Sequence, residues 1–362
     1  MYVNVKPAKE TAVKKIKVFF ISCALAAGIG TSAFADGNVA DQQQSGNDHD
    51  AYIEQTGAEN QAYQNQNGEF NTATIYQIGN KNSGRQEQYG YGNDALVDQS
   101  GTGGTAYQAQ DGELNIATAY QGGENNYAEQ YQEETAQNAY IEQSDANNAA
   151  YQTQYGDTNS ASITQAGQFN KAEQLQDGTN NSAAIDQTGS SSHDNLAGQW
   201  QAGEANTGYI SQQGAENSAY QYQEGTGNTA DIRQNGTANQ AGDYFFAVAP
   251  GQEQYGTNNS AKIRQSGTGN SAYQYQDGDA NYSDIKQRGT HDGLAAGGDF
   301  GAESYQYGSL NEAYIVQNDV NNYSNVMQDG SANYSSQTQS GSMNVSTVSQ
   351  TGNGNAATSV QN

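Results

Sequence analysis

The sequence predicts an all-β protein, a β-solenoid of about 14 strand–turn–strand rungs with a 22-residue period and two facing, parallel, in-register sheets with amyloid-like stacking. An eleven-residue pattern, N-x-A-x-φ-x-Q-x-G-x-x, recurs from Asn38 onward, with Gln at the seventh position of all 28 repeats. The fifth position alternates between Gln and a small or aliphatic residue over most of the chain, which doubles the period to 22. Neither proline lies in an expected strand, and central strands need every backbone N–H.

The composition excludes an ordinary globular core. The 362 residues are 34% hydrophobic and 14% charged, whereas typical soluble domains are about 45–50% apolar and about 25% charged. Disordered chains are often rich in proline and lysine, but this chain has 2 Pro, 43 Gly and 26 Tyr. The net charge of −26 argues against nucleic acid as a partner.

Residues 1–35 have the features of a secretory signal peptide. A lysine-rich stretch precedes a mostly apolar run from Val18 to Ile29, and small residues favour cleavage after Ala35. The run is shorter than the ~20 residues that span a bilayer. We therefore expect residues 36–362 to be secreted without a transmembrane segment. Loss of five Lys and one Glu leaves 8 basic and 38 acidic residues, a net charge of −30.

The third, fifth and seventh positions of each repeat share one strand face, because strand side chains alternate with a period of two. The G-x-x-N segment between strands has the residues of a turn. An unpaired buried amide costs roughly 1–3 kcal/mol, so each Gln should hydrogen-bond the same Gln in neighbouring rungs. The expected core ladder includes Gln44, Gln55, Gln66, Gln77, Gln154, Gln165, Gln223, Gln234, Gln265, Gln276, Ile53, Ile75, Ile141, Ile163, Ile185, Ile210, Ile232, Ile263, Ile285, Asn60, Asn71, Asn148, Asn159, Asn217 and Asn228.

The end rungs of such a stack are expected to promote self-assembly. Solenoids usually cover their ends with atypical capping units. The first repeat begins two residues after the expected mature N-terminus and the last is incomplete, which leaves no room for a cap. An uncovered strand edge is a template for another chain, and a head-to-tail contact that does not close gives a filament. The chain itself is thus its expected partner.

Charges on the outer face are arranged unevenly. Acidic residues occupy every second rung at the sixth position of the Ile-type strands, from Glu54 to Asp186, which avoids stacking like charges. One hypothesis is an interaction patch that contacts acidic partners, such as the acidic half of neighbouring filaments; it contains Arg233, Lys262, Arg264, Lys286 and Arg288. Three insertions near it, at about 190–194, 243–251 and 292–299, could mark a binding face. The alternative is loop drift, with Asp231 and Asp284 offsetting these cations.

Other features do not indicate an enzyme, and we expect no catalytic site, metal or cofactor. No P-loop, nucleophile elbow or dinucleotide motif occurs in a credible context. His193 and His291 would lie about four rungs, or ~19 Å, apart, too far for one ion. Tyrosine rows, including Tyr107 and Tyr151, favour cross-strand packing, with lateral fibre contact or surface adhesion as the alternative.

The combined pattern N-x-A-x-I-x-Q-x-G-x-x-N-x-A-Y-Q-x-Q-x-G resembles the curlin repeat, with matching stretches from Asn217 to Gln234 and from Asn259 to Gln276. This resemblance implies a curli-type subunit, a functional amyloid of the bacterial biofilm matrix that serves adhesion and cohesion at the cell surface. It also implies an outer-membrane secretion channel and a nucleator subunit as partners.

Two alternative functions stay open at this point. One is a minor nucleating curlin subunit, because the last four repeats are irregular. The other is a monomeric β-solenoid that acts as an adhesin or binds ice or carbohydrate. That alternative would require end caps and a flat, regular outer array such as threonine rows.

Overall fold

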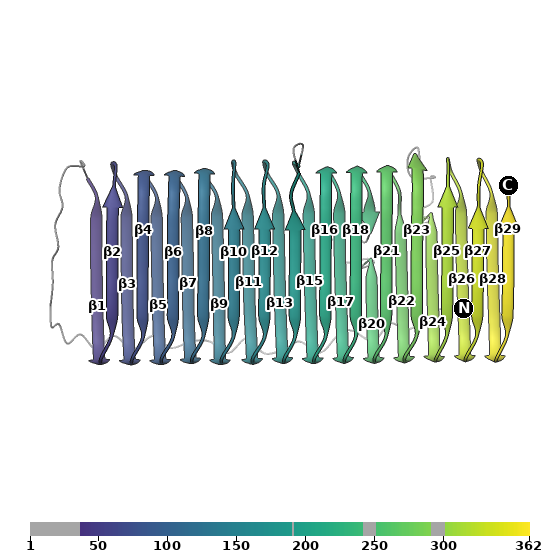
Figure 1. Ribbon diagram of the computed structural model, residues 1–362, viewed down its shortest axis with the longest axis horizontal. Helices are drawn as coiled ribbons and strands as arrows, with labels where there is room; N and C mark the ends of the chain where they lie inside the picture. The colour runs from purple at the N-terminus through teal and green to yellow at the C-terminus, as the bar shows by residue number, and fades with distance from the viewer. Residues whose placement is uncertain (1–36, 190–191, 242–250, 291–300) are drawn as a thin grey trace, which may run out of the picture.

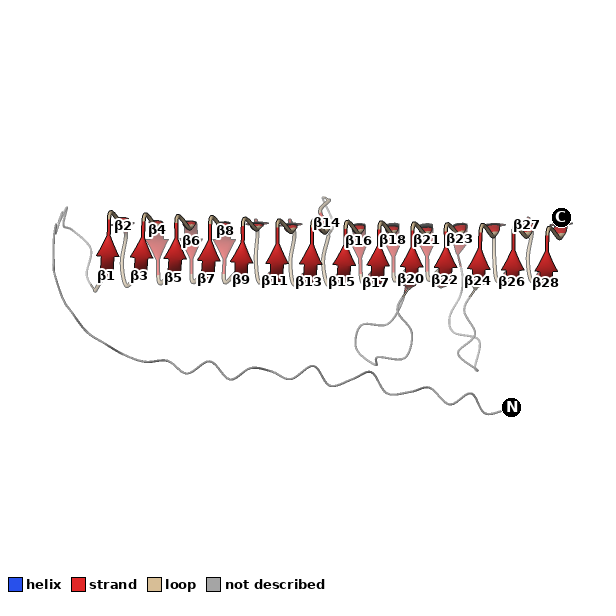
Figure 2. Cartoon of the chain, turned by 90° about the horizontal axis from the view of Figure 1, so that it is seen from below, coloured by secondary structure: helices blue, strands red, loops and turns tan. Residues whose placement is uncertain are grey.

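The computed structural model describes residues 37–189, 192–241, 251–290 and 301–362, which form strands and turns without a helix. The expected signal segment with Ala35, residues 190–191 of the first insertion, residues 243–250 of the second and all of the third lie outside the described residues. The fold class is confirmed, because two parallel sheets run side by side along one axis and the chain alternates between them (Figures 1 and 2).

Odd-numbered strands, joined later by even-numbered ones, build the first sheet, which we call sheet A. Its strands are β1 (Val39–Asn47), β3 (Gln61–Glu69), β5 (Ser83–Tyr91), β7 (Thr105–Glu113), β9 (Tyr127–Thr135), β11 (Ala149–Asp157), β13 (Lys171–Thr179), β15 (Leu196–Glu204), β17 (Ser218–Thr226), β19 (Gln240–Ala241), β20 (Gln252–Thr257), β22 (Ala272–Asp279), β24 (Ala302–Ser309), β26 (Tyr323–Ser331) and β28 (Val345–Asn353).

The intervening strands build the facing sheet B. They are β2 (Asp50–Thr56), β4 (Thr72–Asn80), β6 (Asp94–Thr102), β8 (Ile116–Glu124), β10 (Asn138–Gln143), β12 (Ser160–Gln165), β14 (Ser182–Gln187), β16 (Thr207–Ala215), β18 (Thr229–Thr237), β21 (Ser260–Thr268), β23 (Tyr282–Thr290), β25 (Glu312–Asn318), β27 (Tyr334–Gln339) and β29 (Ala356–Gln361).

One strand of each sheet forms a rung, numbered from rung 1 (β1 and β2) to rung 14 (β28 and β29). Rung 10 contains β19, β20 and β21, because β19 and β20 both pair with β17 across the second insertion. All pairings are parallel, and each repeat position stacks on itself; Gln66, for example, pairs with Gln44 and Gln88. The 22-residue period therefore sets one register for the whole stack.

Glycine at the ninth position is favoured by close backbone contact between rungs, although Glu134, Asp145 and Asp319 also adopt a positive φ there. Gly225 has a φ of +122°, and a Cβ on it would lie 2.0 Å from the carbonyl oxygen of Gly256. Residues at the eleventh position also adopt left-handed backbone conformations, with a φ of 58° at both Phe70 and Leu114. The sequence pattern did not reveal this second feature, because no residue type marks the eleventh position.

The core between the sheets is thin and mixed. Alanines at the third position and aliphatic residues at the fifth position of sheet B form one buried cluster, in which Ile141 is fully buried. In rungs 13 and 14 the fifth-position residues exchange sheets: Val326 and Val348 lie in sheet A, opposite Gln337 and Ser359 in sheet B. Each of these rungs therefore still combines one aliphatic and one polar residue.

We predict that Gly225→Ala destabilises the fold by at least about 2 kcal/mol, because it adds a strained positive φ and a backbone clash. The matched control is Gly122→Ala. A Cβ at Gly122 would meet nothing closer than 3.8 Å, so the expected change is within about 0.5 kcal/mol. Denaturant midpoints of the two variants measure the difference, and equal midpoints would refute the close-contact explanation.

Candidate functional site

A row of buried glutamines at the seventh position runs through each sheet and connects the rungs. Gln66 Nε2 donates to Gln88 Oε1 at 2.9 Å, and also to the carbonyl oxygen of Asp50 at 3.0 Å in the facing sheet. The neighbouring glutamines repeat this pattern. The seventh-position residues selected from the sequence lie in these rows: Gln44, Gln55, Gln66, Gln77, Gln154, Gln165, Gln223, Gln234, Gln265 and Gln276.

A second glutamine row occupies the fifth position of sheet A and ends inside the chain. It runs from Gln42 to Gln274 through amide–amide hydrogen bonds such as Gln64 Nε2 to Gln86 Oε1 at 2.9 Å. At its end, Gln274 Nε2 donates to Ser283 Oγ at 2.9 Å, so a hydroxyl replaces the next amide. Ser304 follows in this row, and its buried Oγ has no hydrogen-bond partner within the described residues.

First-position asparagines form columns at the turns. Asn60 Oδ1 accepts from the backbone N–H of Asn82 at 3.0 Å, while its Nδ2 donates to the carbonyl of Gly79 at 2.8 Å. The six asparagines selected from the sequence are buried: Asn60, Asn71, Asn148, Asn159, Asn217 and Asn228. His49 takes the asparagine role in rung 1, because Nδ1 accepts from Asn71 N–H at 3.3 Å while Nε2 contacts Ser45 O at 3.1 Å. The repeat pattern alone did not indicate this role for His49.

The isoleucine column in sheet B provides most of the aliphatic burial. Ile75, Ile141, Ile163, Ile185, Ile210, Ile232, Ile263 and Ile285 are at most 2% exposed. Ile53 is only partly buried, because its strand β2 has a neighbour on one side only within the described chain. The end rung thus shows which contacts each interior rung gains from stacking.

The two ends of the solenoid are chemically different, because each seventh-position glutamine of rungs 1 to 13 donates to the equivalent glutamine of the next rung toward the C-terminal end. At rung 1, Gln44 and Gln55 donate to rung 2, and no donor reaches their Oε1 atoms within the described residues. At rung 14, Gln350 and Gln361 donate only to backbone carbonyls of the facing sheet. One end therefore presents amide acceptors, and the other presents amide donors with spare capacity.

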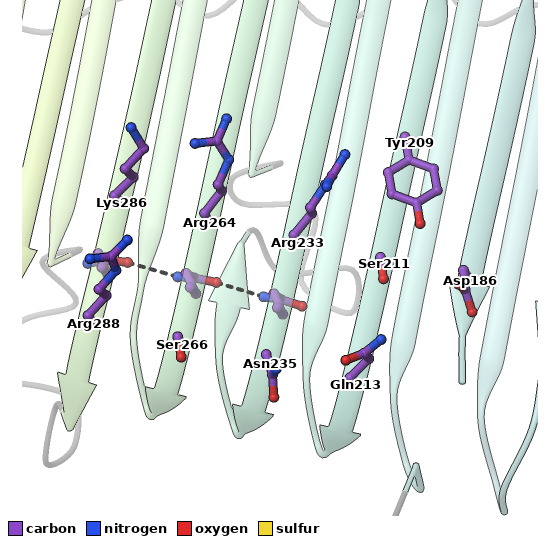
Figure 3. A pocket seen from close by; sticks show the side chains of 13 residues that line it. Asp186, Tyr209, Ser211, Gln213, Arg233, Asn235, Arg264, Ser266, Lys286 and Arg288 are labelled. Carbon is purple, nitrogen blue, oxygen red and sulfur yellow. Dashed lines mark hydrogen bonds between the residues drawn. The ribbon is translucent and has the colours of Figure 1, made fainter. Parts of the chain in front are cut away.

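The five basic residues selected from the sequence lie on the outer face of sheet B, across rungs 9 to 11. Arg233, Arg264 and Lys286 stack in register at the sixth position, with Arg288 two residues after Lys286 (Figure 3). Together with Asp186, Tyr209 and other side chains they surround a pocket of about 400 Å³. Tyr209, Ser211 and Gln213 also line this pocket. They were not predicted to belong to the site, although their register positions place them there.

Part of this positive charge is neutralised within the chain. Arg233 Nε lies 3.0 Å from Asp231, and Lys286 Nζ lies 3.1 Å from Asp284. Arg264 is 3.7 Å from the same Asp284 carboxylate, while Lys262 Nζ lies 5.3 Å from the centre of the Tyr282 ring. Arg288 has no ion pair within the described chain. Five cations and two carboxylates leave a local excess of three positive charges.

Aromatic side chains stack along sheet A. Tyr255 lies 5.4 Å from Tyr222 and 5.7 Å from Tyr275, measured between ring centroids, and Tyr107 accompanies Glu87 in an earlier row. These contacts are cross-strand packing within the chain. Burial, followed by the nearby carboxylate of Glu87, raises the pKa of Tyr107 to about 12. Burial and Asp277 raise the pKa of Tyr275 to about 12.

The histidines are the candidate metal ligands of this sequence. His193 Nδ1 contacts Asp194 at 3.1 Å, and His291 lies outside the described residues. Among the residues that the structure describes, no group of three or more His, Cys, Asp or Glu side chains could hold a metal ion. The described segments also contain no helix long and apolar enough to cross a membrane.

Comparison with known proteins identifies the repeat. The family model of the curlin-associated repeat matches the chain twice, at residues 203–236 and 256–289. These matches span β16 to β18 and β21 to β23, where the glutamine, glycine and asparagine columns are regular. No curated protein matches the chain.

We predict that Gln154→Leu destabilises the solenoid by about 3 kcal/mol, because Gln132 loses its acceptor and Gln176 loses its donor. The same substitution at the exposed Gln43 should change the free energy of unfolding by less than about 0.5 kcal/mol. Denaturant titrations followed by circular dichroism measure both variants. A small loss at Gln154 would contradict the ladder as the main structural constraint.

The tyrosine pKa values predict alkaline sensitivity. The folded-state pKa of Tyr107 and Tyr275 is near 12, above the ordinary value of 10. The folded state therefore holds these protons more tightly, so its stability is complete below pH 10 and is lost as the pH rises through 12. We expect strand circular dichroism to decline in that window. The Tyr107→Phe, Tyr275→Phe double variant should decline at higher pH, and an unchanged profile would contradict this assignment.

Proposed function

We propose that this chain, a curlin-repeat protein, is a secreted structural subunit that stacks end to end into extracellular fibres of a bacterial biofilm matrix. The repeat and the solenoid fold support a structural, non-catalytic role. The observation that carries the proposal is the chemical difference between the two ends of the described stack. Amide acceptors at rung 1 that no described donor reaches complement amide donors with spare capacity at rung 14. Another copy can supply the missing neighbours by continuing the stack.

The residues at the two ends support a head-to-tail junction. Stacking rung 14 on rung 1 of the next copy places Gln350 over Gln44 and Gln361 over Gln55, which continues both seventh-position rows. Parallel strand edges would continue at the same time, and exposed strand edges are templates for pairing. A head-to-tail contact of this kind does not close, so it generates a filament.

Secretion and surface assembly complete the proposed role. The expected signal segment at residues 1–35 would direct the chain to export. The resemblance to the curlin repeat implies an outer-membrane channel and a nucleator subunit, which we include in the proposal as partners. The acidic outer face would help to keep the chain dispersed before it reaches a growing end.

A nucleating subunit is the second candidate function, and the exchanged fifth-position residues favour it. At the junction, Val348 would meet Gln42 and Ser359 would meet Ile53, so the fifth-position rows do not continue into the next copy. A chain whose C-terminal end differs from its N-terminal end could start fibres of another subunit. Rapid self-seeded growth would favour the main subunit role, whereas growth only with a second curlin protein would favour nucleation.

The proposal is tested with the chain that begins at Asp36. Purified at neutral pH, it should bind amyloid dyes and give fibre reflections at ~4.8 and ~10 Å. Ala40→Pro should slow elongation about tenfold, because it removes an edge N–H and introduces a ring at the open edge of β1. Ala40→Ser, which keeps the N–H, should elongate normally. A chain that stays monomeric under these conditions would refute the proposal.

A further inference from the structure

One column of side chains on the outer face of sheet B is divided by charge. At the sixth position, rungs 5 and 7 carry Glu142 and Asp186, whereas rungs 9, 10 and 11 carry Arg233, Arg264 and Lys286. Rung 8, between the two halves, carries the uncharged Ser211. The acids are two rungs apart, which is also the separation of Arg233 from Lys286.

The two halves also differ in the length of their outward-facing side chains. Rungs 6 and 7 present short outward side chains, including Ser162, Thr164 and Ala184. Rungs 8 to 11 present long ones, including Tyr209, Arg264 and Arg288, and Figure 3 shows them standing around the pocket. A ridge of long cationic side chains therefore adjoins a shallow acidic surface on the same face.

The acidic half lacks cationic partners of its own. Glu142 accepts from Tyr140 and Asp186 from Thr188, and neither forms an ion pair with a described residue. In the basic half, Arg288 has no ion pair in the described segments, and the Arg233 side chain is 60% exposed although it contacts Asp231. Both halves therefore retain charge that a complementary surface could neutralise.

We propose that a second copy of this chain binds this face, with the two sheet B surfaces packed against each other and the two solenoid axes antiparallel about rung 8. Rung 7 of each copy then faces rung 9 of the other, and rung 5 faces rung 11. Asp186 meets Arg233 and Glu142 meets Lys286, and the two-fold symmetry forms each contact twice. The short side chains of rung 6 receive the Arg264 ridge of rung 10.

The spacing of the charges favours this arrangement over a parallel one. Centred on rung 8, the antiparallel pair overlaps rungs 2 to 14 and places no like charges opposite each other at the sixth position. A parallel pair shifted by four rungs would place Glu54 opposite Glu142 and Asp98 opposite Asp186. Shifting a parallel pair by eight rungs avoids this repulsion but leaves only six overlapping rungs.

The contact is large enough to be specific. Rungs 5 to 11 span about 34 Å at strand spacing, and strands of six residues are about 20 Å long, which gives roughly 700 Å² per copy. Stable interfaces bury about 800 Å² per partner. The interface does not require end-to-end stacking, so it can form between single chains and between fibres.

Charge reversal tests the proposal directly. Variant one is Arg233→Glu with Lys286→Glu, and variant two is Glu142→Lys with Asp186→Arg. Each alone should associate at least about tenfold more weakly, because like charges then face each other. An equimolar mixture should recover association, because variant one pairs with variant two through attractive contacts on both sides of the two-fold axis. Sedimentation of the full chain and the width of fibre bundles in electron micrographs are the measurements.

The matched control is Lys81→Glu with Lys171→Glu. It changes the net charge by the same amount as variant one, but its residues lie away from the outer face of sheet B. It should associate like the original chain. Dye binding and the ~4.8 Å reflection report axial stacking separately, so a variant that forms single, unbundled fibres fails only in the lateral contact. Normal association of either variant, or a mixture that does not recover, would overturn the proposal.

Cross-linking fixes the geometry. Ser211 faces itself across the two-fold axis, whereas Thr338 in rung 13 faces rung 3. With Cys23→Ser as background, Ser211→Cys should give dimers with a short bis-maleimide, and Thr338→Cys should not. The reverse pattern would exclude the antiparallel pair. Binding of polygalacturonate, an acidic polysaccharide, distinguishes a second kind of partner. If it requires Arg233 and Lys286 while variant two still associates normally, this face binds acidic polysaccharide and the proposal is wrong.

Discussion

The amide hydrogen bond between equivalent glutamines is the interaction on which the rest of the structure depends. Gln66 can be buried only because Gln44 and Gln88 lie directly beside it and the facing carbonyl of Asp50 accepts its second proton. A buried amide without partners is costly, so every rung needs a matching rung. This requirement sets the register, while the backbone N–H groups that pair with neighbouring rungs exclude proline from the strands. It also explains how a chain that is only 34% hydrophobic folds.

The same constraint gives the stack a direction. The Nε2 atom of each seventh-position glutamine in rungs 1 to 13 donates toward the C-terminal end. Within the described residues, the Oε1 atoms of Gln44 and Gln55 therefore lack a donor at one end, and Gln350 and Gln361 retain donor capacity at the other. Glycine at the ninth position permits the close approach of successive turns that keeps the amides within hydrogen-bond distance. Where the second glutamine row, at the fifth position of sheet A, stops at Gln274, the hydroxyl oxygen of Ser283 accepts the hydrogen bond instead of another amide. The proposed axial assembly would extend this pattern rather than create a new kind of contact.

The outer face follows different rules, because solvent satisfies its polar groups. The sixth position of sheet B is not part of the hydrogen-bonded glutamine rows, so its residue type varies, from Glu142 to Arg233. Acidic and basic residues at this position occupy separate rungs. Tyrosines lie along neighbouring rungs. Burial raises the pKa of Tyr107 and Tyr275, and the carboxylates of Glu87 and Asp277 add to this effect. The proposed axial contact therefore involves the core rows, whereas the proposed lateral contact involves the outer face.

The sequence by itself determined the period, the sheet class, the register and the identity of the core columns. Those features repeat in every rung, so a single pattern displays them 14 times. Only the tertiary structure decided the direction of the amide row, the left-handed backbone at Phe70 and Leu114, the substitution of His49 for asparagine and the partner of Gln274. The physical reason is that these features depend on which atom of a neighbouring rung a group reaches. Residue types that repeat along a chain specify which side chains stack, but not which donor meets which acceptor.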